Sequence, residues 1–112
     1  MPIPVLVWVV SIALTTTVAV AFADEIKEWA RETVRRIINA IDSILYTVGD
    51  ALANLIYEGR KYIREVKVWL FNEETEQYEI QTERQVVPDS EVPPEIKENL
   101  QRKRKIKISE IR

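Results

Sequence analysis

The sequence predicts an α+β fold anchored in a membrane, with an N-terminal transmembrane helix, a long amphipathic helix and a small C-terminal module of a β-hairpin, a helix and a strand. Three observations lead to this fold class. Residues 1–23 carry no charged side chain, although the 112-residue chain has 16 Lys and Arg and 18 Asp and Glu. Apolar residues then repeat at helical spacing as far as Leu55. After Gly59 they alternate as in a strand.

Residues 1–23 have the length of a membrane anchor. Between Ile3 and Phe22 the only polar side chains are one serine and three threonines. At about 1.5 Å per residue this run reaches roughly 30 Å, the thickness of a bilayer's hydrocarbon core. Lys and Arg follow the run and none precede it, which favours an N-terminus outside and a cytoplasmic C-terminal module. We therefore predict a single-pass protein with the lipid bilayer as a partner.

Small residues recur every fourth position in this segment and predict close helix packing in the membrane. The row consists of Ser11, Thr15, Ala19 and Ala23. An alternative is a secretory signal cleaved after Ala23, because small residues also stand at positions 21 and 23. That alternative would leave a secreted small domain. The apolar run is longer than an ordinary signal and lacks a basic start, so we favour the retained anchor.

Residues 24–60 predict one amphipathic helix for packing and oligomerisation. Their apolar positions repeat at alternating steps of four and three, as on one face of a helix. A Gly-Asp pair at residues 49–50 is a candidate break that would fold the segment into a hairpin of two helices. So much apolar surface on one helix needs a partner, and we predict a homo-oligomer interface. It consists of Val34, Ile37, Ile41, Ile44, Val48 and Leu55.

Residues 61–112 predict a small α+β module. Val66, Val68 and Leu70 alternate with more polar or aromatic neighbours, and the alternation resumes at residues 78, 80 and 82 after an acidic turn at 72–76. This pattern is typical of a β-hairpin. Two prolines at 93–94 favour the start of a short helix that runs to about residue 102. Residues 105–108 alternate again and predict a third strand.

The residue inventory argues against an enzyme. The chain has no His and no Cys, so the usual zinc sites, a Ser-His-Asp triad and a cysteine nucleophile are excluded. The acidic residues between 73 and 83 lack the spacing of a calcium loop, which favours a solvated hairpin tip. We predict no catalytic residue, no metal, no cofactor and no small-molecule substrate.

Charge is distributed unevenly in the C-terminal half. Residues 61–100 hold ten acids and five bases, whereas residues 101–112 hold six bases and one acid. Without interleaved aromatics, a basic cluster attracts anionic partners but does not read a sequence. We predict an electrostatic contact with anionic lipid, nucleic acid or an acidic protein surface. The residues are Arg102, Lys103, Arg104, Lys105 and Lys107.

These features together predict a non-catalytic structural or scaffolding subunit of a membrane-associated homo-oligomeric assembly. Two alternatives use the same segments differently. A virion or filament subunit would use the amphipathic helix as packing material. A membrane-perturbing protein of the toxin or holin type would oligomerise through the small-residue row.

Overall fold

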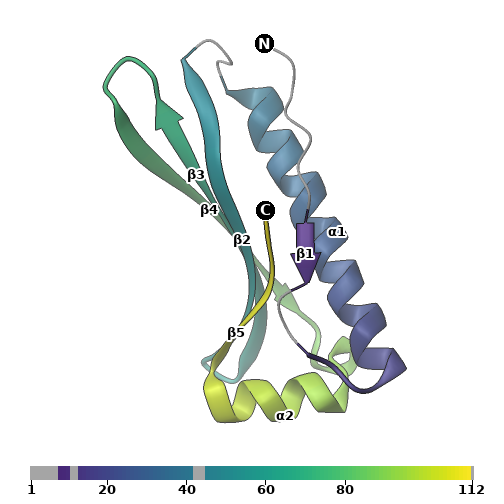
Figure 1. The fold of residues 1–112 in the computed structure, drawn as a ribbon. Coiled ribbons are helices and arrows are strands. Elements are labelled where there is room, and N and C mark those ends of the chain that lie inside the picture. Colours follow the sequence, from purple (N-terminus) through teal and green to yellow (C-terminus); the bar gives the residue numbers. More distant parts are fainter. Residues whose placement is uncertain (1–7, 11–12, 42–44, 112) are drawn as a thin grey trace.

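A computed structural model describes residues 8–10, 13–41 and 45–111. These residues form a small α+β fold with two α-helices and an antiparallel sheet of four long strands, to which a three-residue strand is added at one edge (Figure 1). The strand order is β1-β5-β2-β3-β4. The elements are β1 (Trp8–Val10), α1 (Thr17–Ala40), β2 (Tyr46–Glu58), β3 (Lys61–Asn72), β4 (Gln77–Val87), the 3-10 turn η1 (Asp89–Glu91), α2 (Pro94–Lys103) and β5 (Lys105–Ile111).

Helix α1 lies across one face of the sheet, and α2 crosses the end where β2 stops and β5 starts (Figure 1). Two buried clusters join these layers. In one, the first turns of α1 pack with α2 and β5, and Ile26 and Leu100 are fully enclosed. In the other, the second half of α1 packs on β2 and β3 through Val34 and Val66. The apolar stripe of α1 is therefore covered by the chain's own sheet.

The predicted single-pass membrane anchor is wrong. Among the described residues, no helix combines enough length with enough apolar character to cross a bilayer. Two elements divide the apolar run: β1 occupies Trp8–Val10, and α1 begins only at Thr17. Helix α1 then continues past Asp24 into a strongly charged stretch, so only its first two turns are uncharged. The predicted orientation, with the N-terminus outside and the C-terminal module cytoplasmic, is withdrawn with the span.

The predicted long helix over residues 24–60 is also wrong in its second half. Helix α1 ends at Ala40, where the N–H of Ile41 donates to the carbonyl of Ile37, and residues 46–58 form β2. Within β2, residues 51, 53 and 55 are buried on one face of the strand, and Asn54 and Ile56 are buried on the other. The same residues fit a helical stripe because their neighbours Leu52 and Ile56 are apolar as well. Gly49, the predicted helix break, is instead the site of a register shift between β2 and β3.

The elements after Gly59 lie where the sequence predicts them. Strands β3 and β4 pair without a register shift from Tyr62 and Val87 to Asn72 and Gln77. The turn between them is held by Asn72, whose Oδ1 accepts from the N–H groups of the second and third residues after it at 2.9 and 3.1 Å. Helix α2 begins at Pro94, and Arg104 ends it in the left-handed region at φ 67°. Strand β5 follows at once.

Candidate assembly surface

Strand β4 forms an edge of the sheet, and no described strand pairs with its outer side. Its 11 residues run from the tip of the β3–β4 hairpin down to Val87, which packs in the cluster that holds the first turns of α1 (Figure 1). Along the whole strand only Val87 is buried and only Glu83 is half-buried. An exposed edge leaves a row of backbone N–H and C=O groups available for another strand.

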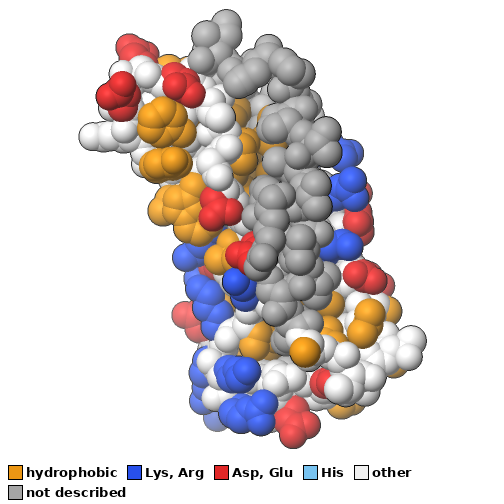
Figure 2. All heavy atoms as spheres, in the orientation of Figure 1, with side chains coloured by type: hydrophobic (Ala, Val, Ile, Leu, Met, Phe, Trp, Pro, Cys, Tyr) orange, Lys and Arg blue, Asp and Glu red, His pale blue; other side chains and the backbone are white. Residues whose placement is uncertain are grey.

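The side chains of β4 alternate between two faces. Val66 and Val68 of β3 pack against α1, so Trp69 and its paired residue Ile80 point to the opposite side, which we call the outer face. On this face Tyr78, Ile80 and Val86 remain 62%, 58% and 56% exposed. Figure 2 shows hydrophobic side chains gathered along the hairpin arm, next to the acidic side chains at its tip. Exposed large apolar side chains on an edge strand are typical of a contact surface.

Aromatic rings form the apolar end of the outer face. The rings of Phe71 and Tyr78 lie 5.2 Å apart at 59°. Tyr78 reaches across the sheet toward β2, and a Cβ at Gly49 would lie 2.7 Å from its Cε1 atom. Glycine at the β2 irregularity therefore leaves the space that this ring occupies. A shallow hollow of about 340 Å³ is lined here by Gly49, Asp50, Trp69 and Tyr78.

A buried carboxylate lies in the middle of the outer face. Glu65 is fully buried, and its carboxylate accepts from Nε of Arg84 at 2.8 Å and from Nδ2 of Asn54 at 3.2 Å. Arg84 is half exposed and also approaches Glu58 at 3.3 Å. Sequence inspection missed this network, although the hairpin register sets Glu65 directly opposite Arg84. The predicted turn, residues 72–76, would set Glu65 opposite Glu83, whereas the observed strands pair one residue further along β3.

One end of the molecule is acidic, and the other carries a cluster of basic side chains together with the exposed carboxylates of Glu58 and Glu98. The hairpin tip presents exposed carboxylates, which we call the acidic tip: Glu73, Glu74, Glu76 and Glu79. The other end presents the basic side chains of the β2–β3 turn and of the α2–β5 junction, because Lys105 pairs with Ile56 near the end of β2. We call it the basic end: Arg60, Lys61, Arg102, Lys103, Arg104 and Lys105. Figure 2 shows acidic side chains at the hairpin tip and basic ones beside α2.

The predicted basic run is exposed but partly engaged within the chain. Arg102 donates to Asn99 at 2.9 Å, and Arg104 lies 5.3 Å from the ring centroid of Tyr57. Lys107 pairs with Glu110 at 3.2 Å. Lys103 and Lys105 are exposed. The run thus keeps a solvent-facing charged surface, while its electrostatic role stays a prediction.

The other predicted contact residues lie mainly inside the fold. In the proposed oligomer stripe, Val34, Ile37 and Leu55 are core residues, and Ile41 and Val48 pack beside them, whereas Ile44 lies outside the described residues. The small-residue row is divided as well. Ala19 and Ala23 are buried in the α1–α2 cluster, and Ser11 lies outside the described residues.

Thr15, the remaining member of that row, helps to hold a carboxylate of α2. Glu95 accepts from the backbone N–H and the hydroxyl of both Thr15 and Thr16, at 2.7 to 3.2 Å. The hydroxyl bond from Thr15, followed by the two backbone bonds, lowers the pKa of Glu95 from 4.5 to about 2. This clamp joins the start of α1 to the start of α2. It links residues about 80 positions apart, and no local pattern in the sequence signals it.

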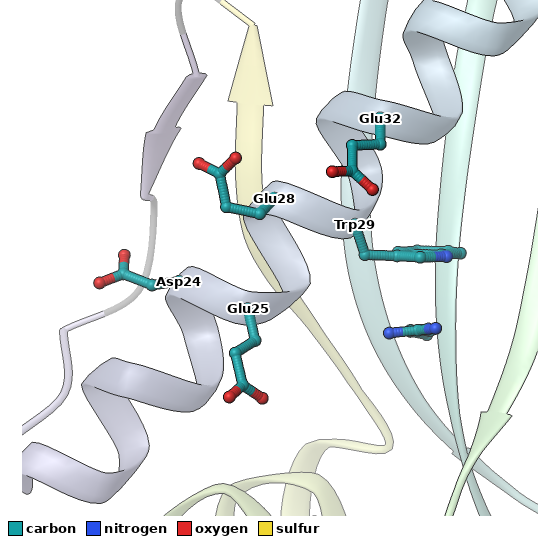
Figure 3. Close-up of a pocket in the computed structure, with 6 residues that line it drawn as sticks. Asp24, Glu25, Glu28, Trp29 and Glu32 are labelled. Carbon is teal, nitrogen blue, oxygen red and sulfur yellow. The ribbon is translucent and has the colours of Figure 1, made fainter.

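A second hollow, of about 490 Å³, lies beside α1. It is lined by Asp24, Glu25, Glu28, Trp29, Glu32 and Arg64. Figure 3 shows that its four carboxylates point in different directions from the helix. Correspondingly, no group of three or more potential ligands in the described part of the chain could hold a metal ion. The guanidinium of Arg64 lies 4.5 Å from the ring centroid of Trp29 and also binds Gln85, so this side chain joins α1 to β3 and β4.

No protein-family model, no curated protein and no solved structure matches this chain. Functional inference therefore rests on the surfaces described above.

Proposed function

We propose that this protein is a non-catalytic structural subunit that associates with copies of itself through β4. The observation that carries the proposal is the long exposed edge of β4 with the three apolar side chains Tyr78, Ile80 and Val86 on one face. Association would pair the free backbone groups of the edge and remove these side chains from water.

The limited edge protection of β4 supports this proposal. Proteins that must stay monomeric protect edges with charged side chains, especially Lys, or with Pro, bulges or short strands. Residues 77–87 contain neither Lys nor Pro, and β4 pairs with β3 over its full length without a bulge. Its charged residues are Glu79, Glu83 and Arg84, of which Glu83 lies 3.5 Å from Arg36 of α1 and Arg84 binds Glu65. Little on this strand opposes pairing with another one.

The chemistry of the hollows supports a non-catalytic role. Catalytic sites need a nucleophile, an acid or a base that converges on one point within hydrogen-bond reach. In the hollow at Gly49 the one carboxylate, Asp50, accepts from its neighbour's backbone N–H at 2.8 Å. In the hollow beside α1 the carboxylates diverge (Figure 3).

Light scattering or sedimentation over a concentration series tests the proposal. We expect the mean mass to rise with concentration, and Ile80→Lys to weaken association at least about tenfold, because it removes buried apolar area and adds an edge charge. Val18→Lys is the matched control, since Val18 is 64% exposed in the first turn of α1 and is not part of β4. A monomeric protein at all soluble concentrations, or equal effects of both variants, would contradict the proposal.

A further inference from the structure

We propose that two copies join β4 to β4 in antiparallel orientation, about a twofold axis that passes beside Thr82. This inference rests on the proposed self-association and specifies its geometry. It follows from three features of the described residues: the charge at the two ends, the alternation of side chains along β4, and the positions of its carboxylates.

The charges at the ends favour antiparallel pairing. Strand β4 starts beside the acidic tip and is followed by Asp89 and Glu91 of η1, where Lys97 binds Asp89 at 2.8 Å. In an antiparallel pair the acidic tip of one copy therefore lies near a segment of mixed charge in the other copy. A parallel pair would place acidic tip against acidic tip.

The face alternation restricts the register. Residues directly opposite each other in an antiparallel pair point to the same face. In a symmetric pair one residue must therefore lie opposite its own copy, and the twofold axis passes between the two copies of that residue. Thr82 is the middle residue of β4, and an axis there pairs all of Gln77–Val87 with its counterpart. An axis at residue 80 or 84 would leave a third of the strand unpaired.

The carboxylates distinguish Thr82 from its immediate neighbours. An axis at residue 81 sets Glu79 opposite Glu83, and an axis at residue 83 sets Glu83 opposite itself, and both are unfavourable. An axis at Thr82 sets each glutamate opposite a glutamine. On the outer face it sets Thr82 opposite Thr82, a favourable cross-strand pair, and Val86 opposite Tyr78, whose ring lies towards β2 of its own copy.

Ile80 then lies opposite Arg84. The guanidinium of Arg84 binds Glu65 of β3 at 2.8 Å, on the side away from the second copy, so its charge stays paired within its own chain. In this register no two carboxylates of β4 lie opposite each other. The pairing uses the same edge in both copies, so it closes as a dimer with one continuous sheet and does not extend into a filament.

Single cysteines test this geometry cleanly because the chain has none of its own. Paired Cα atoms in antiparallel strands lie about 4.5–5.5 Å apart, within the range that a disulfide spans. We expect Thr82→Cys to form a covalent dimer under mild oxidation. Gln81→Cys is the matched control, since its two copies would be offset by two residues, roughly 8 Å between Cα atoms, and should not cross-link.

The outcomes separate this inference from the proposed self-association. Cross-linking at position 82 and not at 81 supports the Thr82 axis. Cross-linking at both positions indicates parallel in-register strands and overturns the geometry, while self-association stands. If the wild-type protein associates but Thr82→Cys forms no disulfide, the geometry is likewise overturned and self-association stands. A wild-type protein that stays monomeric overturns both.

Discussion

Replacing Arg84 by Gln should measure how much the guanidinium of Arg84 contributes to stability by pairing with the buried carboxylate of Glu65. The charged groups approach to 2.8 Å, and at an effective dielectric constant of about 20 the gross attraction is roughly 6 kcal/mol. Desolvation and the half-exposed position of Arg84 cancel most of it. Asn54 keeps its hydrogen bond to Glu65. We therefore expect Arg84→Gln to lower the free energy of unfolding by about 2–3 kcal/mol.

The matched variant Glu65→Gln removes the buried charge itself. It should cost less, about 1 kcal/mol, because Arg84 can still reach Glu58 and solvent. The double variant should then lose less than the sum of the two single losses, with a coupling of about 1–2 kcal/mol. Urea unfolding at neutral pH measures this, with every variant built on Ile80→Lys so that self-association does not contribute. Additive losses, or an Arg84→Gln variant as stable as its parent, would refute the argument.

Two further predictions concern the ends of elements. The lowered pKa of Glu95 means that its clamp stabilises the fold fully above pH 4.5 and loses this contribution as the pH falls towards about 2. The free energy of unfolding, measured as a function of pH, should show that loss in the wild-type protein. In Glu95→Gln the decrease between pH 4.5 and about 2 should be smaller. At Gly59, φ is +58° and a Cβ would meet nothing within 4 Å. Gly59→Ala should therefore cost about 1 kcal/mol from backbone strain alone, as thermal unfolding can show, whereas a loss of several kcal/mol would point to a packing role.

The sequence predicted the C-terminal elements because their signals are local. The acidic turn, the paired prolines and the alternation near residue 106 each act within a few residues. The boundary between α1 and β2 could not be predicted in this way, since residues 51–56 are apolar on both faces and fit either period. Alternation placed Tyr78 and Ile80 on one face of the predicted hairpin but did not mark them as a contact surface, because their exposure depends on α1 covering only the opposite face. A local pattern cannot show which face a distant helix covers.

The apolar N-terminal segment illustrates the same difficulty, because apolar composition alone does not distinguish a lipid-facing helix from a core helix. The small side chain of Ala23 is 1% exposed and packs in the cluster that α1 forms with α2 and β5. Ala23→Leu should therefore overpack that cluster and lower the free energy of unfolding by about 1–3 kcal/mol. Val18→Leu, at a position that is 64% exposed, should leave stability nearly unchanged. In a lipid-facing helix both leucines would be accommodated equally, so equal thermal unfolding of the two variants would contradict the packing of α1 against the core.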